Sequence, residues 1–230
     1  EVHKDLQIVC WMQRHFNDDA LLSNSGYRFN DLPSGSKIGT SSVRRRAQIL
    51  RLRKDLSVSL LRGNIDTRIK QLHAKKYDAI ILSLAGLQRL NLENLVTEVL
   101  TQDDFLPAAC QGVVGVQAHK KNNYTDLFSK LNHLKTQMEC LAERNVLRVI
   151  NANCNSPISV VSKITNNEIE IKVQLLNHFG ESIFSKIYTD LKNNHLQLSE
   201  IIGNEIISEV GNTTIEKLNN LENDFDYTPT

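Results

Sequence analysis

The stretch that decides the fold reads Lys37-Ile38-Gly39-Thr40-Ser41-Ser42-Val43-Arg44-Arg45-Arg46. It begins as the end of a strand, and Ser41 or Ser42 can cap a helix that runs to about Arg53. The apolar residues at helical spacing on one face of that helix are Val43, Ala47 and Leu50. A helix N-terminus with free backbone N–H groups, hydroxyl residues and arginines is a site for anions.

A second junction of the same kind follows. The run Ser57–Leu61 predicts a strand, and the next residues read Leu61-Arg62-Gly63-Asn64-Ile65-Asp66-Thr67-Arg68. Asn64 is placed to cap a helix whose buried side carries Ile65, Ile69 and Leu72. A third strand, Asp78–Leu84, is nearly continuously apolar and should end at Gly86, as expected where both faces of a sheet are covered.

Repeated strand–helix–strand units from Ser36 to about Leu100 predict a parallel, doubly wound α/β sheet. Such sheets bind ligands at the carboxyl ends of their strands, where both arginine junctions are expected to lie. Two anion sites in succession indicate a ligand with several negative groups.

The second half of the chain has a different pattern. Pro107–Gly115 is a break, and Val113–Val116 reads as a short strand of another sheet. Helices are predicted over 124–131 and 136–149. A separate small α+β domain is expected to begin near Leu134, between these two helices.

Within that domain, Asn151–Pro157 is rich in turn residues. Apolar and polar residues alternate from Ile169 to Leu175, which predicts a strand of an antiparallel sheet with one face buried. A related strand spans about 183–188, and Asn223–Thr230 reads as a loose tail. A helix follows the second strand, with its apolar positions at Leu198, Ile201, Ile202, Ile206 and Ile207.

Composition excludes several classes of protein. The 230 residues are 40% hydrophobic and 23% charged, with a net charge of +1, which argues against a general nucleic-acid binder. No apolar run approaches the roughly 20 residues that span a bilayer. The polar start Glu1–Asp5 is no signal peptide, and without an initiator Met the chain is expected to begin inside a longer protein.

The positions of the arginines relative to the predicted helix starts divide them into candidate ligand contacts and surface residues. Arg44, Arg45, Arg62 and Arg68 each flank a helix start that should face a ligand, whereas a solvated basic helix face accounts for Arg46, Arg51 and Arg53. Arg89 follows the third strand and is as consistent with a surface residue as with a ligand contact. Nucleic-acid binding is a weaker third hypothesis because no aromatic residues interleave with these arginines.

The cysteines are Cys10, Cys110, Cys140 and Cys154, and they form no C-x-x-C pair or metal-ligand spacing. Free thiols in a reducing compartment are the expectation. Cys154 lies in a polar loop and should be accessible, either as an ordinary loop cysteine or as a nucleophile or attachment point, whereas Cys140 lies in a helix. The seven histidines read as surface or structural, and the acidic residues show no obvious catalytic pair.

Taken in order, these motifs resemble those of the hydroxymethylbilane synthase (porphobilinogen deaminase) family over essentially the whole chain. The matching elements are Gly39–Arg45, Leu61–Arg68, Asp78–Leu82, Ala85–Arg89, Gln111-Gly112, and Cys154 with Pro157. Each is weak alone, and the combination in this order is highly specific.

The resemblance implies a transferase of porphyrin and haem biosynthesis that condenses four porphobilinogen molecules into hydroxymethylbilane with release of ammonia. Its cofactor, dipyrromethane, would be held by a thioether to Cys154. The growing pyrrole chain accumulates carboxylates, which the family contacts with residues matching Thr40, Ser41, Ser42, Arg44, Arg45, Arg62, Arg68, Arg89 and Gln111. Arginine–carboxylate pairs would hold the reacting carbons in line.

The chain departs from the family at three places. The catalytic aspartate should lie upstream of residue 1, so this chain alone is expected to contain no catalytic residue and to be inactive. Ala152-Asn153 replaces the usual Gly-Gly before the attachment cysteine, and Asn153 is expected to tolerate a positive φ. Cys110 replaces a usual glycine before Gln111.

The expected fold is a periplasmic-binding-like doubly wound domain with a small antiparallel α+β domain. Expected boundaries are 1–17, a remnant of a first domain with its hinge; 18–106, the arginine-rich domain; 107–132, a crossover segment; and 133–230, the cofactor-carrying domain. We expect a monomer in cytoplasm or plastid that acts on a small molecule, without nucleic acid or membrane. The competing hypothesis is a non-enzymatic two-lobed binder of polycarboxylates, which needs no covalent anchor at Cys154.

Overall fold

A computed structural model describes residues 3–121 and 125–220 of the chain. Its largest sheet has five strands in the order β4 (Ser57–Leu60), β3 (Lys37–Thr40), β5 (Ala79–Ser83), β2 (Asp19–Ser23) and β6 (Glu98–Leu100). The central strand β3 runs parallel to β4 and β5, as predicted. The sheet is mixed and not wholly parallel, because β2 runs antiparallel to both β5 and β6.

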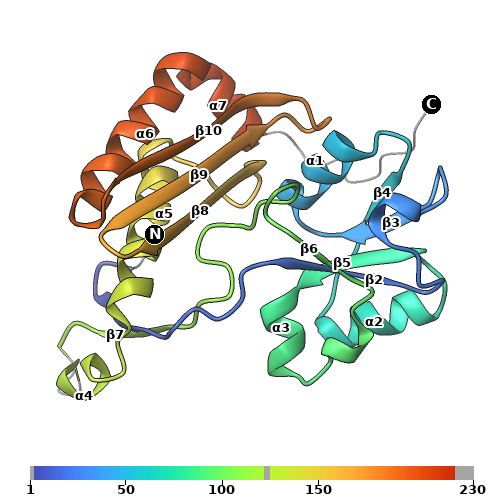
Figure 1. Cartoon of the computed structure of the whole chain (residues 1–230), viewed down its shortest axis with the longest axis horizontal. Helices are drawn as coiled ribbons and strands as arrows, with labels where there is room; N and C mark the ends of the chain where they lie inside the picture. The colour runs from blue at the N-terminus through green and yellow to red at the C-terminus, as the bar shows by residue number, and fades with distance from the viewer. Residues whose placement is uncertain (1–2, 122–124, 221–230) are drawn as a thin grey trace.

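Helices cover both faces of this sheet, which confirms the doubly wound arrangement (Figure 1). Helix α1 (Val43–Leu52) packs on one face through Ile49 and Leu50. Helices α2 (Ile65–His73) and α3 (Leu84–Arg89) pack on the other. Gly86 does not end the third strand as predicted; β5 stops at Ser83 and Gly86 lies inside α3. Two short 3-10 helices complete this half, Phe29–Asp31 and Glu93–Leu95.

Strands β1 (Leu6–Trp11) and β7 (Gly115–His119) pair in antiparallel orientation and form a separate two-stranded sheet. The strand predicted near Val113 therefore belongs to another sheet, as expected, with its start shifted to Gly115. The short helix α4 (Thr125–Ser129) follows within the predicted range.

The C-terminal part has a three-stranded antiparallel sheet in the order β10 (Ser182–Leu191), β9 (Glu168–Leu176) and β8 (Ile158–Thr165). Helices α5 (Leu134–Val149) and α6 (His195–Val210) pack against each other and against this sheet. The 3-10 turn Lys192–Asn194 precedes α6, and α7 (Asn212–Asn220) follows it. The alternation of β9 is confirmed, since Ile169, Ile171 and Val173 are all buried. Strand β8 and helix α7 were not predicted. The predicted tail 223–230 lies outside the described residues.

The prediction of a solvated basic face for Arg46, Arg51 and Arg53 is wrong, and for Arg46 the reason is that the C-terminal part packs on α1. The turn after β9 approaches the end of α1 so closely that a Cβ on Gly180 would lie 2.3 Å from the Arg51 backbone nitrogen. Arg46 is consequently buried, not solvated. Arg51 and Arg53 are half-buried, and their guanidinium groups bind backbone carbonyls, of Asp104 for Arg51 and of Phe29, Asn30 and Leu32 for Arg53.

Within the described residues, no helix is long and apolar enough to cross a membrane.

Candidate anion-binding site

The two arginine junctions lie side by side at one edge of the five-stranded sheet. Strands β3 and β4 are adjacent and parallel, with Thr40 opposite Leu60, so the helices that follow them start at the same edge. Both predicted caps are present: the Ser42 hydroxyl accepts a hydrogen bond from the Arg45 backbone N–H (3.3 Å), and the Asn64 side chain accepts one from Thr67 (2.9 Å). Thr40 is fully buried and accepts a hydrogen bond from the Ser42 N–H, and Ser41 is half-buried.

Asp19, the first residue of β2, lies at this same edge opposite Ser83, the last residue of β5, and is fully buried. Arg44 donates from Nη2 to its Oδ2 at 2.8 Å, and Arg45 donates from Nε and Nη2 to its Oδ1 at 3.0 and 2.7 Å. Each arginine also donates to a backbone carbonyl, that of Leu106 for Arg44 and that of Ile81 for Arg45. Two cations therefore share one anion, and the edge keeps an excess of positive charge.

The electrostatics of Asp19 follow from this geometry. Burial alone would raise the pKa of Asp19, but the charges and hydrogen bonds of Arg44 and Arg45 outweigh it and hold that pKa below its ordinary value. Burial lowers the pKa of Arg44, the nearby charge of Arg45 lowers it further, and Asp19 opposes both. Asp19 thus stays ionised at neutral pH.

Gln111 connects the crossover segment to this cluster. Its amide nitrogen donates to the Asn17 carbonyl (2.6 Å) and to Oδ1 of Asp19 (2.9 Å), and its oxygen accepts from Arg44 (3.2 Å). Arg89 is exposed and donates to the carbonyl of Gly112, the next residue (3.0 Å). The structure therefore brings together Arg44, Arg45 and Gln111, with Arg89 adjoining them through Gly112.

Arg62 and Arg68 extend the cationic edge onto the second junction. Arg68 donates from Nε to the Gly63 carbonyl (2.7 Å), and its pKa is lowered first by burial and then by the charge of Arg45. Arg62 is exposed. Among the described residues, neither Arg62, Arg68 nor Arg89 forms an ion pair with an acidic side chain.

Cys154 is exposed, as predicted, in the turn between α5 and β8. The turn is fixed to α7, because the Ser156 hydroxyl binds the Asn219 side chain and Asn153 donates to the Asn219 carbonyl (3.3 Å). The left-handed residue is Asn151, with φ 51°, and not Asn153 as expected. No hydrogen bond or ion pair among the described residues joins Cys154 to the arginines of the sheet edge.

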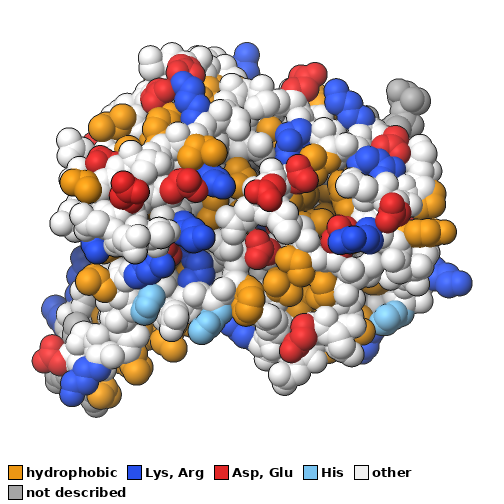
Figure 2. All heavy atoms as spheres, viewed as in Figure 1, with side chains coloured by type: hydrophobic (Ala, Val, Ile, Leu, Met, Phe, Trp, Pro, Cys, Tyr) orange, Lys and Arg blue, Asp and Glu red, His pale blue; other side chains and the backbone are white. Residues whose placement is uncertain are grey.

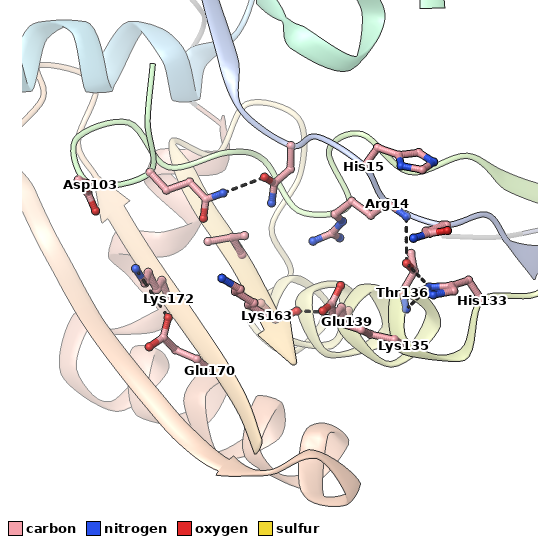
Figure 3. A pocket seen from close by; sticks show the side chains of 15 residues that line it. Arg14, His15, Asp103, His133, Lys135, Thr136, Glu139, Lys163, Glu170 and Lys172 are labelled. Carbon is pink, nitrogen blue, oxygen red and sulfur yellow. Dashed lines mark hydrogen bonds and ion pairs between the residues drawn. The ribbon is translucent and has the colours of Figure 1, made fainter. Parts of the chain in front are cut away.

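A cavity of about 750 Å3 lies elsewhere, between the segment 13–17 and the C-terminal sheet (Figure 3). Lys163 of β8 and Lys172 of β9 line it, together with the acidic Glu139 and Glu170. Its charges are mixed, and none of the predicted site residues lines it, so the cavity is not the predicted anion site.

Reasoning from the sequence missed Asp19, although it stands in the pair Asp18-Asp19 directly before the apolar Ala20-Leu21-Leu22. A carboxylate at the first position of a buried strand requires cations close by. The sequence also gave no sign of the ion pair between Arg14 and Glu143 (2.8 Å), whose side chains are 8% and 0% exposed. That pair ties the segment before β2 to helix α5.

Comparison with known proteins identifies two family models along the chain. Residues 1–126 match the dipyrromethane cofactor-binding domain of porphobilinogen deaminase, and residues 137–216 match its C-terminal domain. A porphobilinogen deaminase of Clostridium acetobutylicum is 42% identical over 153 residues, which cover 66% of this chain and 53% of the relative. One from Clostridium kluyveri is 33% identical over 202 residues, 88% of this chain and 69% of the relative. The chain thus spans between about half and about two thirds of the length of these relatives.

Among solved structures, an arginine-specific periplasmic binding protein of Salmonella typhimurium matches with a TM-score of 0.35 and 14% identity, covering 53% of this chain and 56% of that one. A methionine-binding lipoprotein of Bacillus subtilis, described as putative, matches with the same TM-score and identity, covering 55% and 59%.

Proposed function

This chain belongs to the porphobilinogen deaminase family, and we propose that the protein condenses four porphobilinogen molecules head to tail into hydroxymethylbilane, releasing one ammonia for each and consuming one water, which supplies the terminal hydroxyl group. The observation that carries the proposal is the cationic edge of the five-stranded sheet. Two arginines share the single carboxylate of Asp19, and three more have no acidic partner among the described residues. Such an edge suits a ligand that carries many carboxylates.

The residues present fit a dipyrromethane cofactor. Cys154 offers an exposed thiol on a turn that hydrogen bonds hold to α7, so a group attached there would have a fixed base. When bound, dipyrromethane supplies the anchor from which the pyrrole chain is extended. We propose Cys154 as its attachment point, with the arginines of the sheet edge as ligands for its acetate and propionate groups.

Each residue of the edge has a distinct proposed part. Arg62, Arg68 and Arg89, which have no carboxylate of their own, bind substrate or cofactor carboxylates through their planar donor forks. Asp19 holds the guanidinium groups of Arg44 and Arg45 in fixed orientations, so their remaining donors are oriented before a ligand arrives. The N–H groups at the starts of α1 and α2, with Thr40, Ser41 and Ser42, complete the edge.

We also propose the domain boundaries 1–17, 18–106, 107–132 and 133–230. The separate five-stranded and three-stranded sheets support the second and fourth of them. The protein is proposed to be a monomer that acts on a small molecule in a reducing compartment, either cytoplasm or plastid. The free cysteines support the choice of compartment. The acidic and basic side chains interspersed in Figure 2 form no continuous basic stripe on that face, which favours a small-molecule substrate over nucleic acid.

Turnover by the full-length protein tests the proposal. Purified protein incubated with porphobilinogen should consume it and release an equal amount of ammonia, with hydroxymethylbilane formed at one quarter of that amount. Saturable binding of porphobilinogen without ammonia release would instead support the non-enzymatic polycarboxylate binder.

A further inference from the structure

Two cysteines that the proposed function does not use lie together where the crossover segment meets α5. The sulfur atoms of Cys110 and Cys140 and a carboxylate oxygen of Glu143 all lie within 4.8 Å of one another. We propose that Cys110 and Cys140 are a redox-sensitive pair, which an oxidant such as hydrogen peroxide converts into a disulfide that locks the crossover segment to α5. This inference is independent of the proposed catalytic activity.

The backbone holds Cys110 in place for this role. The backbone φ of Cys110 is 59°, in the left-handed region that residues other than glycine rarely adopt. The Cys110 N–H donates to Oε2 of Glu143 at 2.6 Å, and its thiol lies 3.7 Å from the Cys140 carbonyl oxygen. With the backbone held in this way, the sulfur of the half-buried Cys110 lies within 4.8 Å of the sulfur of Cys140.

The surroundings favour reaction at Cys140. A hydrogen bond from the Cys110 thiol is the main cause that lowers the pKa of Cys140, against the opposing effects of burial and of Glu143. Arg14 assists with its charge and with a hydrogen bond from Nη2 to the Cys140 sulfur at 3.3 Å. A thiolate is the reactive form of cysteine toward peroxides and disulfides.

The same cluster is poorly suited to a metal ion. Glu143 already accepts hydrogen bonds from the two terminal nitrogens of Arg14, at 2.8 and 2.9 Å, and from the backbone N–H groups of Cys110 and Ser162. Because the Arg14 guanidinium bridges Glu143 and Cys140, a cation bound there would have to displace it. Oxidation leaves this hydrogen-bonded carboxylate undisturbed.

The oxidation can be written with all atoms accounted for. One thiol is oxidised by hydrogen peroxide to a sulfenic acid, and one water is released. The sulfur of the other thiol then attacks the sulfenic sulfur, which forms the S–S bond and releases a second water. A dithiol reductant returns both thiols by exchange.

The proposed disulfide would act next to the anion site. Gln111, which follows Cys110, binds Arg44 and Asp19, and Gly112 accepts from Arg89. Linking residue 110 to residue 140 would therefore restrain the segment that carries these contacts.

Peptide mapping of the full-length protein tests the pair. Reduced protein is treated with a small excess of hydrogen peroxide, alkylated, digested without reductant and analysed by mass spectrometry. We expect one peptide pair linking Cys110 to Cys140, lighter by two hydrogens and separated by dithiothreitol. The oxidised protein should also melt about 5 °C or more above the reduced form, as a closed loop restricts the unfolded chain.

Cys110→Gly is the informative variant, since glycine suits the positive φ and the fold should persist without the thiol. It should lose both the cross-link and the rise in melting temperature, whereas the matched variant Cys10→Ser should keep both. Linkage of either cysteine to Cys10 or Cys154, or sulfinic acid at Cys110 or Cys140 with no cross-link, would overturn the proposal.

Discussion

At the scale of single residues, the candidate site depends on the carboxylate of Asp19. It receives four hydrogen bonds, one from Arg44, two from Arg45 and one from Gln111. Without it, two arginine side chains that are 6% and 11% exposed would face each other without an anion. A buried ion pair need not stabilise a protein relative to apolar residues, but breaking one is costly.

Asp19→Asn should therefore lower the free energy of unfolding by about 3–5 kcal/mol, measured by urea denaturation of the full-length protein. Asp18→Asn is the matched control at the preceding position, where the carboxylate accepts a hydrogen bond from Gln102 and forms no ion pair with any described residue. It should change stability by less than about 1 kcal/mol. Equal losses in the two variants would show that Asp19 has no special role.

The pH dependence of stability follows from the same carboxylate. Because the pKa of Asp19 is lowered in the folded state, its contribution is complete above the unfolded value of about 3.9 and is lost as pH falls through the folded pKa. Denaturation series from pH 6 to pH 2 should show this loss in the native protein. The slope below about pH 4 should be shallower in Asp19→Asn. Identical slopes would contradict the ion cluster.

Local signals explain why the residues of the two junctions could be predicted and Asp19 could not. The caps at Ser42 and Asn64 form bonds within three residues, so a short motif contains all the necessary information. Asp19 is buried because arginines 25 and 26 positions away fold onto it. Arg46 likewise looked solvated because the turn that covers α1 comes from the C-terminal part.

At the scale of elements, strand β8 could not be predicted because buried polar residues, which form tertiary hydrogen bonds, interrupt its apolar sequence pattern. Ser159 and Ser162 are buried, so polar residues interrupt its apolar run. Ser162 is satisfied by Glu143 and by the Glu139 carbonyl, and Ser159 by the Leu106 carbonyl. Strand β9 was found from its alternation of apolar and polar residues, because the buried positions Ile169, Ile171 and Val173 are all apolar.

The turn between β9 and β10 provides a test of packing between elements. Gly180→Ala places a Cβ in a residue with φ 85° and 2.3 Å from the Arg51 backbone nitrogen. Strain and overpacking together should cost about 2–5 kcal/mol in urea denaturation. Gly26→Ala, at φ 72° with nothing within 4 Å, isolates the backbone strain and should cost about 1–2 kcal/mol. A similar cost at both positions would contradict the packing of this turn on α1.

At the scale of the whole molecule, the sheet edge and the turn of Cys154 belong to different parts of the chain. The described structure joins these parts through Arg14 and Glu143, through the turn at Gly180, and through Leu106, whose carbonyl accepts from both Arg44 and Ser159. The proposed function requires both parts, because in that proposal the arginines bind the group that Cys154 holds.

Substitution of Arg68 best tests whether the arginines of the sheet edge are needed for the proposed activity. It lies near Arg45 without an acidic partner, so replacing it should not damage the ion cluster. Arg68→Gln should reduce porphobilinogen turnover by about 10- to 100-fold, the loss of one charged hydrogen-bonding contact. Arg148→Gln, on the exposed face of α5, is the control and should retain turnover. Unchanged turnover in Arg68→Gln would remove that residue from the site.

The central claim, a pyrrole cofactor attached at Cys154 and bound by the arginine edge, is tested most directly by the intact mass of the full-length protein produced in a haem-synthesising host. The account predicts a mass above that of the polypeptide by one dipyrromethane. This added mass should be lost in Cys154→Ser and kept in Cys110→Ser. An unmodified native protein, or an adduct that persists in Cys154→Ser, would contradict it.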